Sequence, residues 1–241
     1  MALPKLNNAT YELTLPSTGE QIKYRPFLVK EQKSLMIAQE SEDDKQIENT
    51  LAQILNDCVL EDIDPYKMPV FDVEYLFLRI RGKSVGEKVT VRLLCPDDEK
   101  TRVDVDINLE EVDVQMSNDH TNVIRLTKDI SLVMRYPRFE DMSGFDNESQ
   151  TNSLFDMIKR CVHEIHDGDT IHHRVDMSEK DLETFIESMS TQNLEEVSVF
   201  FDTMPKLIHI VKAKNPKTKK KVEIPIEGLQ NFFGKPFLMI L

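Results

Sequence analysis

The chain has 241 residues, of which 40% are hydrophobic, and a formal net charge of −13. This composition indicates a folded chain that is long enough for one large domain or two of ordinary size. The negative charge disfavours broad nucleic-acid binding, which needs clustered cations, and only seven glycines disfavour a nucleotide-binding fold, which needs glycine where backbone meets phosphate.

The chain begins with "MALPKLNNATYELTL", which lacks the basic start and the continuous apolar stretch of a signal peptide. No later stretch reaches the roughly 18 apolar residues that a membrane-spanning helix needs. We therefore expect a soluble protein made in the cytoplasm, without a membrane segment.

The first half of the chain predicts a β-hairpin, then helices, then a second hairpin. Alternating apolar and polar residues on either side of the turn "PSTG" indicate strands over 10–15 and 21–24. Pro26 ends the second of these strands. Apolar residues at three- and four-residue spacing indicate a helix from Val29 and another over 44–60. The run "FDVEYLFLRIRGKSVG" is ambiguous by itself, and strands follow over 88–95 and 101–107.

The second half predicts strands near 122–126 and 130–136, followed by helices over about 149–165, 179–189 and 194–203. Two further strands, 207–213 and 221–226, flank the lysine-rich stretch "KNPKTKK". A short helix in "EGLQNFFG" comes near the end of the chain. The order of elements is again hairpin, helices, hairpin.

Four pairs of strings suggest an internal duplication. "IKYRPF" matches "VMRYPRF", "ILNDCV" matches "MIKRCV", "DVEYLF" matches "DLETFI", and "LLCPDDEKTRVDVDI" matches "VKAKNPKTKKKVEIPI", all in the same order. We expect two related modules, 1–116 and 121–241, of an α+β fold class. The match also favours a helix for the ambiguous run. Convergent amphipathic patterning is the alternative explanation.

The string "GKSVG", residues 82–86, resembles two catalytic motifs. It fits the G-x-S-x-G elbow of serine hydrolases, but the elbow needs strand, turn, helix, and the predicted order here is helix, turn, strand. It also contains the end of a phosphate-binding loop, yet Phe77 stands where that loop needs glycine. A helix cap followed by a turn is the simpler interpretation.

The string "CVHEIHDGDTIHH" gathers potential metal ligands. We weigh two hypotheses: a transition-metal site or an enzyme of unrecognised type using this cluster, and a solvated turn after a helix with a buried thiol. The matching stretch "CVLEDID" has no histidine, which favours the second hypothesis, and we expect no cofactor. The ligands in question are Cys161, His163, His166, His172 and His173.

The other cysteines do not suggest a metal site or a disulfide framework. The three cysteines of the chain are widely scattered and odd in number, so we expect reduced thiols. Cys95 is the only cysteine in either late hairpin, whereas a structural zinc site needs four ligands. Cys58 matches Cys161 in the internal comparison, and both are expected in helical cores.

The stretch "KAKNPKTKKK" holds six lysines in ten residues. It could dock on an acidic protein surface, bind nucleic acid or form a solvated hairpin tip that prevents strand pairing. Several phenylalanines follow, most of them expected in a core, and the tail "FLMIL" either packs on its own domain or is buried by a partner. The candidate partner contacts are Lys217, Lys219, Lys220, Lys221, Phe232, Phe233 and Phe237.

Three strings resemble a known family: "LPKLNNATYELTLPSTGEQIKYRPFLVKEQKSLMIA", "FDVEYLFLRIRGKSVGE" and "FFDTMPKLIHIVKAKNPKTKKKVEIPIEGLQNFFG". They are similar to the baseplate hub proteins of T-even-type contractile-tailed bacteriophages, and the start is also similar to small phage tail-assembly chaperones. The resemblance implies a non-enzymatic tail morphogenesis protein, a hub subunit or a hub-assembly chaperone, without catalytic residues to transfer.

The resemblance also implies partners and a location. The expected partners are other baseplate hub proteins and tape-measure proteins, with no nucleic acid or small molecule. The expected location is the host cytoplasm during assembly, and the tail baseplate of the virion if the protein is retained. A nucleic-acid accessory protein that uses the lysine hairpin stays open as a further hypothesis.

Overall fold

The computed structural model describes residues 7–41, 43–143 and 150–233. The chain forms two compact units: unit 1 is Met1–Gln115 with Lys206–Leu241, and unit 2 is Met116–Pro205. The expected modules 1–116 and 121–241 follow the order of the sequence, whereas unit 2 ends at Pro205, because the strands after it pair within unit 1. The mixed α+β class predicted from the sequence is confirmed.

Unit 1 begins with the predicted hairpin, in which β1 (Tyr11–Thr14) pairs antiparallel with β2 (Gln21–Tyr24). Helices α1 (Val29–Ser41), α2 (Asp44–Cys58) and α3 (Val70–Val85) follow. The α2 helix forms because its apolar residues recur every three or four positions, so that Ile47, Leu51, Ile54 and Leu55 are buried on one face. The ambiguous run is helix α3, as the internal comparison predicted.

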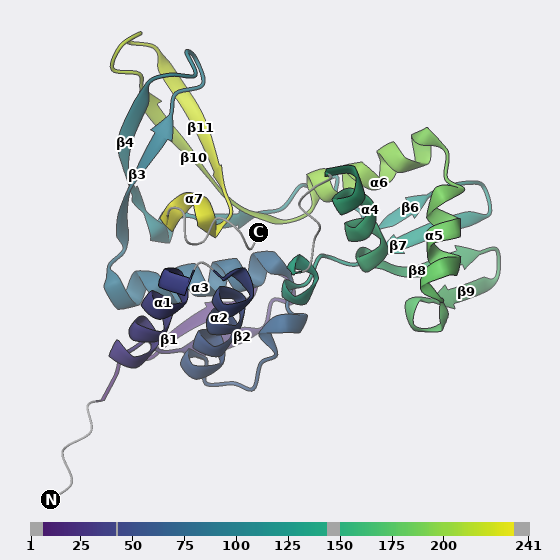
Figure 1. Ribbon diagram of the computed structural model, residues 1–241, viewed down its shortest axis with the longest axis horizontal. Helices are drawn as coiled ribbons and strands as arrows, with labels where there is room; N and C mark the ends of the chain where they lie inside the picture. Colours follow the sequence, from purple (N-terminus) through teal and green to yellow (C-terminus); the bar gives the residue numbers. More distant parts are fainter. Residues whose placement is uncertain (1–6, 42, 144–149, 234–241) are drawn as a thin grey trace, which may run out of the picture. The chain divides into compact units, whose positions relative to one another are not determined.

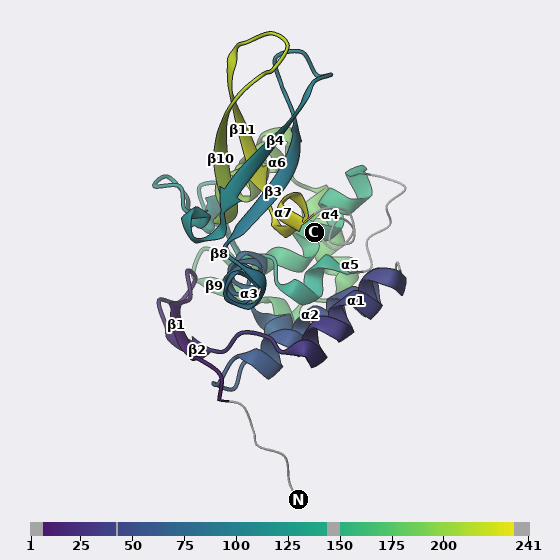
Figure 2. The ribbon, with the colours of Figure 1, turned by 90° about the vertical axis from the view of Figure 1, so that its left-hand side faces the viewer.

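Two long hairpins form the part of unit 1 that we call the arm. One pairs β3 (Lys88–Leu94) with β4 (Arg102–Asn108), and the other pairs β10 (Lys206–Lys214) with β11 (Lys221–Glu227). Figures 1 and 2 both show the two hairpins side by side. The short strand β5 (Asp113–Gln115), which the sequence analysis missed, adds to β10. Helix α7 (Leu229–Phe233) follows β11.

Unit 2 is a four-stranded antiparallel sheet covered by helices. The strand order is β6 (Val123–Arg125), β7 (Ile130–Met134), β8 (Val162–Asp167) and β9 (Thr170–His173). Its core joins sheet residues such as Leu132 and Met134 to apolar residues of the helices. The helices are α4 (Gln150–Cys161), α5 (Glu179–Glu187) and α6 (Thr191–Thr203).

The predicted helix over 149–165 is wrong at its end. Helix α4 stops at Cys161, and Val162 begins strand β8, which pairs with β7 on one side and β9 on the other. Gly168 and Asp169 form the two-residue turn between β8 and β9, with Gly168 at φ 56°, where glycine is favoured. The Gly-Asp pair between two stretches of strand was the turn signal that the prediction of a helix overlooked. Strand β9 was not predicted either, whereas the helices and strands named above other than β5, β8 and β9 were predicted within a few residues, apart from the end of α4.

Short 3₁₀ turns complete both units. They are η1 (Pro65–Lys67), η2 (Leu109–Glu111), η3 (Phe139–Met142) and η4 (Arg174–Asp176). The turns η1 and η4 each stand directly before a helix of the same unit, α3 and α5. The start of α5 is capped by Ser178, whose hydroxyl accepts from the N–H of Asp181 (3.1 Å).

The chain turns a corner after β2, and Arg25 holds this corner. Its N–H donates to the carbonyl of Cys58 (2.9 Å), and its guanidinium donates to the carbonyl of Pro26 (3.0 Å) and to Glu31 Oε1 (2.7 Å). The N–H of Leu28 donates to the other oxygen of Glu31 (2.8 Å). Burial acts to raise the pKa of Glu31, but these hydrogen bonds outweigh it and hold the pKa below its usual value.

A second corner, after β7, uses the same set of hydrogen bonds. The N–H of Arg135 donates to the carbonyl of Cys161 (2.8 Å), and its guanidinium donates to the carbonyl of Tyr136 (3.1 Å) and to both oxygens of Asp141 (2.5 and 3.0 Å). The N–H of Arg138 donates to Asp141 Oδ2 (2.7 Å). In both corners the carboxylate stands six residues after the arginine, and the helix that ends near the corner supplies a cysteine carbonyl.

Candidate functional site

The "GKSVG" stretch forms the end of helix α3 in unit 1. Ser84 lies inside helix α3, where its hydroxyl accepts from the N–H of Phe27 (2.9 Å) and donates to the carbonyl of Ile80 (2.5 Å). Gly86 ends the helix at φ 134°, and strand β3 follows. The predicted order of helix, turn, strand is confirmed, so Ser84 connects the first corner to α3 and does not stand at a nucleophile elbow.

The cysteine thiols lie inside the protein. Burial raises the pKa of Cys58 and of Cys161 to about 12, and it also raises the pKa of Cys95. All three side chains are buried and unpaired with one another. At neutral pH these groups are therefore protonated thiols, whereas a nucleophilic or metal-binding cysteine acts as the thiolate.

The histidine cluster lies on the β8–β9 hairpin around Glu164. The Glu164 carboxylate lies 2.8 Å from His166 Nε2, 3.2 Å from His173 Nδ1 and 3.7 Å from His163 Nε2. The hydrogen bond with His166 holds the pKa of Glu164 below its usual value. Within the described residues, no three His, Cys, Asp or Glu side chains are arranged to hold a metal ion. Cys161 is buried in the core and His172 is exposed, so the hairpin does not bring the five predicted ligands together.

The two hairpins of the arm end in the same turn. In the first, the N–H of Cys95 donates to the carbonyl of Thr101 (2.8 Å), and the N–H of Glu99 donates back to the carbonyl of Cys95 (3.0 Å). In the second, Asn215 takes the place of Cys95, and the N–H of Lys219 donates to its carbonyl (2.9 Å). Glu99 and Lys219 both adopt positive φ, 52° and 63°. The two tips therefore present side chains from equivalent backbone positions.

Asp97 joins the two tips to each other. Its carboxylate accepts from Asn215 Nδ2 (2.7 Å) and from Thr218 Oγ1 (2.5 Å), residues that lie more than a hundred positions away in the sequence. The hydrogen bond from Thr218 is the main cause of an Asp97 pKa below the usual range. Asn215 is fully buried. The acidic turn of the first hairpin therefore holds the lysine turn of the second in place.

Replacement of Asp97 with alanine is expected to loosen the lysine turn. Both side-chain acceptors disappear, so hydrogen–deuterium exchange at the Lys219 amide should rise on the order of tenfold. Asp106 is the matched control, because its exposed carboxylate accepts from Thr90 Oγ1 (2.6 Å) within the first hairpin. The Asp106→Ala variant should leave exchange at Lys219 unchanged. Equal exchange at Lys219 in both variants would contradict the role of Asp97.

The tip of the second hairpin exposes a group of lysines that we call the lysine tip: Lys217, Lys219, Lys220 and Lys221. Within the part of the chain that the structure describes, none of these four ammonium groups forms an ion pair. Lower on the same hairpin, Lys212 pairs with Glu223 (3.6 Å) and Lys206 with Glu227 (3.2 Å). The unpaired cations are therefore concentrated at the end of the arm.

The predicted phenylalanine contacts do not join the lysine tip. Phe232 is 1% exposed and belongs to the core of unit 1, which removes it from the surface. The side chain of Phe233 and the whole of Phe237 lie outside the described residues. The candidate surface thus consists of the four lysines.

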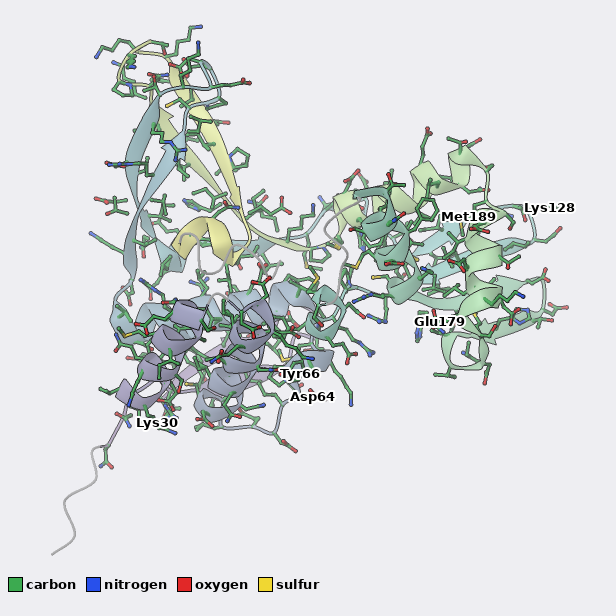
Figure 3. The ribbon with its side chains drawn as sticks, viewed as in Figure 1. Lys30, Asp64, Tyr66, Lys128, Glu179 and Met189 are labelled. Atoms are coloured by element: carbon green, nitrogen blue, oxygen red, sulfur yellow. The ribbon has the colours of Figure 1, made fainter. Side chains whose placement is uncertain are left out.

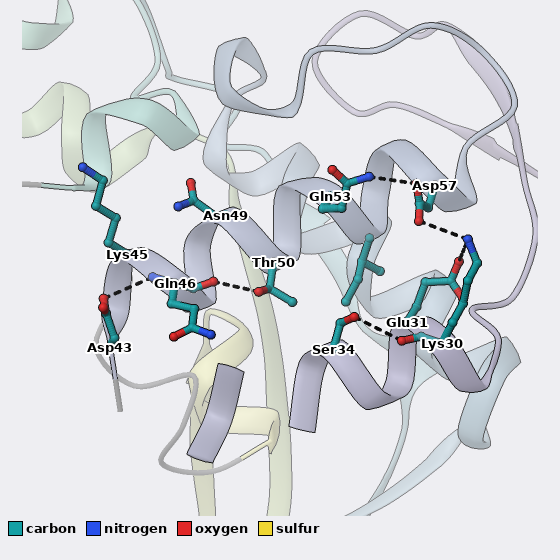
Figure 4. Close-up of a pocket in the computed structure, with 11 residues that line it drawn as sticks. Lys30, Glu31, Ser34, Asp43, Lys45, Gln46, Asn49, Thr50, Gln53 and Asp57 are labelled. Atoms are coloured by element: carbon teal, nitrogen blue, oxygen red, sulfur yellow. Dashed lines mark hydrogen bonds and ion pairs between the residues drawn. The ribbon is translucent and has the colours of Figure 1, made fainter. Parts of the chain in front are cut away.

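A polar groove of about 450 Å³ lies between α1 and α2 (Figure 4). Lys30 Nζ bridges Glu31 (3.1 Å) and Asp57 (3.3 Å) across it, and Gln53 donates to Asp57 (2.8 Å). These groups pair with one another, and Ile54 is the only apolar side chain among the lining residues that the structure describes. Polar residues at four-residue spacing along α2 were the sequence signal for this groove.

A second groove, of about 640 Å³, lies among α4, α5 and α6 and is called the unit 2 groove. The sequence analysis missed it, because its walls come from three helices whose packing no local pattern reveals. Figure 3 labels Met189, one of its lining residues, and Glu179 at the start of α5. Its apolar lining is Phe155, Ile186, Met189 and Leu194, and its charged lining is Asp156, Lys159, Glu183 and Glu187.

Comparison with known proteins identifies a family. The family model described as T4 bacteriophage base plate protein matches residues 8–234, a range that includes parts of both units. No curated protein and no solved structure matches the chain. Among the described residues, no helix combines the length and apolar character needed to cross a membrane.

Proposed function

Because the chain belongs to the T4 bacteriophage base plate protein family, we propose that it works as a subunit of the baseplate hub or as an assembly chaperone of that hub. It is a phage baseplate protein, and its role is structural. In the proposal it acts through contacts with hub and tape-measure proteins, without enzymatic chemistry. It acts in the host cytoplasm during assembly, and in the tail baseplate if it is a hub subunit.

The observation that carries the proposal is the family match over residues 8–234. The match extends from the first hairpin to α7, so it concerns the whole architecture and not one borrowed segment. Ser84 is hydrogen-bonded within unit 1 and the three thiols are buried. Both observations support a non-enzymatic role, because these side chains were the candidate nucleophiles in the sequence.

The lysine tip is the proposed contact with another chain of the assembly. It stands at the end of two joined hairpins, and Asp97 fixes its turn before any partner binds. A surface that is ordered in advance loses less conformational entropy on binding. The exposed, unpaired ammonium groups supply electrostatic attraction to an acidic partner, which speeds association and selects among partners.

The test is co-expression of the tagged chain with the hub and tape-measure proteins of the same phage. We expect at least one of these proteins to co-purify in a fixed ratio. Mass spectrometry of purified particles then separates the two roles, because a hub subunit stays in the particle and an assembly chaperone leaves it. Absence of every one of these proteins from the purified complex would contradict the proposal.

A further inference from the structure

The negative charge of the chain is concentrated in unit 2. Residues 116–205 contain eighteen Asp and Glu against eight Lys and Arg. The lysine tip, by contrast, belongs to unit 1 and gathers four cations without ion pairs in the described structure. The lysine tip is therefore positive and unit 2 is negative. The lysine tip of one copy can be attracted to unit 2 of another copy.

The unit 2 groove has the chemistry that a lysine side chain needs. Phe155, Ile186 and Leu194 contribute apolar lining, and carboxylates of Glu183 and Glu187 stand among the lining residues. A lysine can lay its four methylene groups on apolar surface while its ammonium group reaches a charged partner. The groove thus combines both halves of a lysine-binding site.

The described lining of the unit 2 groove has a net negative charge. Among the described lining residues Lys159 is the only cation, and it pairs with Asp156 (2.8 Å) and Glu183 (3.6 Å). Glu187, on the last turn of α5, makes no ion pair within the described residues. Three carboxylates against one ammonium group leave a net negative lining that an incoming cation would neutralise.

We propose that the lysine tip of one copy docks into the unit 2 groove of a second copy. The occupant is the turn that contains Lys217, Lys219 and Lys220, held in shape by Asp97. Tip and groove are different surfaces, so the contact is head-to-tail, and repetition of such a contact produces a ring or a filament. The inference goes beyond the proposed function and does not depend on which hub protein the chain meets.

Charge reversal tests the contact from both sides. The tip-reversed variant carries Lys219→Glu and Lys220→Glu, and the groove-reversed variant carries Glu183→Lys and Glu187→Lys. All four side chains are exposed, and Glu99 already occupies the backbone position equivalent to Lys219 in the first hairpin, so the tip should keep its fold. Circular dichroism and thermal unfolding of each variant check this point.

Sedimentation of the purified chain measures the association. The wild type should self-associate at about 50 mM salt and dissociate at about 500 mM, because salt screens exposed charge pairs. Each reversed variant should bind itself at least about a hundredfold more weakly. An equimolar mixture of the two variants should associate again, since the lysine tip of one then meets the acidic groove of the other.

Two matched controls change the same charge elsewhere. Lys33→Glu with Lys88→Glu alters exposed lysines of unit 1, and Asp129→Lys with Asp169→Lys alters exposed turns of unit 2. Both controls should associate as the wild type does. A monomeric wild type at low salt would overturn the inference, as would reversed variants that associate normally. Tip-dependent DNA binding by a monomeric wild type would replace it with a nucleic-acid site.

Discussion

The Arg25→Ala variant is expected to lose about 3 kcal/mol of unfolding free energy. Glu31, whose side chain is 2% exposed, would keep its negative charge without the guanidinium that faces it at 2.7 Å. Removing a close counter-charge from a buried carboxylate is strongly destabilising, and here the second counter-charge, Lys30 (3.1 Å), offsets part of the loss. The corner would also lose the bonds from Arg25 to the carbonyls of Pro26 and Asp57.

Urea unfolding measures this loss, and the arm offers a matched control. Arg92 binds Asp104 with two hydrogen bonds (2.7 and 3.0 Å), but both side chains are more than half exposed, so Arg92→Ala should change stability little. The double variant Arg25→Leu with Glu31→Leu should recover part of the loss, because it leaves no unpaired buried charge. Equal effects of Arg25→Ala and Arg92→Ala would refute the explanation.

The Glu74→Gln variant is expected to become more stable than the wild type as the pH rises. Glu74 is buried in α3, where its Oε1 accepts from the N–H of Leu229 at the start of α7 (3.1 Å). Burial raises the pKa of Glu74 to about 8, even though this hydrogen bond acts to lower it. The folded protein therefore keeps a proton that the unfolded chain releases near its ordinary pKa of 4.5.

The sign of the pH dependence follows from this difference in bound protons. Between pH 4.5 and about 8 the folded state binds one more proton than the unfolded state, so stability falls as the pH rises, by at most about 1.4 kcal/mol per pH unit. Glutamine keeps the acceptor for Leu229 and cannot ionise. The variant and the wild type should be similar below pH 4.5 and diverge above it.

Urea unfolding at a series of pH values checks the prediction. Glu20, an exposed residue next to β2, provides the control: Glu20→Gln should leave the pH slope of the wild type unchanged. The comparison is between the slopes of unfolding free energy against pH. A substitution that changes stability equally at every pH therefore does not affect it. If the unfolding free energy of the Glu74→Gln variant changed with pH as that of the wild type does, a group other than Glu74 would cause the pH dependence.

Local patterns predicted the elements of this protein well where one face of an element is buried. The spacing of Ile47, Leu51 and Leu55 predicted α2, and the alternation over 221–226 predicted β11, because a buried face leaves its period in the sequence. The method failed at β8, where the helical reading of "MIKRCV" was carried past Cys161 into a strand. A strand of only three residues, such as β5, leaves no period to detect.

The internal duplication stays a prediction. Two observations favour it: the arginine corners at Arg25 and Arg135 share their hydrogen bonds, and the turns at Cys95 and Asn215 share theirs. The strings that suggested the duplication include these four residues. Their chemical reason became visible only in the structure, because sequence comparison shows that an arginine recurs but not which carboxylate and carbonyl it binds.

The sequence by itself determined the α+β class, the order of hairpins and helices, the lysine cluster and the family, because all of these follow from local periods and strings. Only the tertiary structure decided that the lysine hairpin returns to unit 1, that Asp97 holds its tip, and that three helices enclose an acidic groove in unit 2. Asp97 and Asn215 are separated by 118 positions. Partners so far apart are chosen by the packing of whole elements, which leaves no periodic trace in the residues between them.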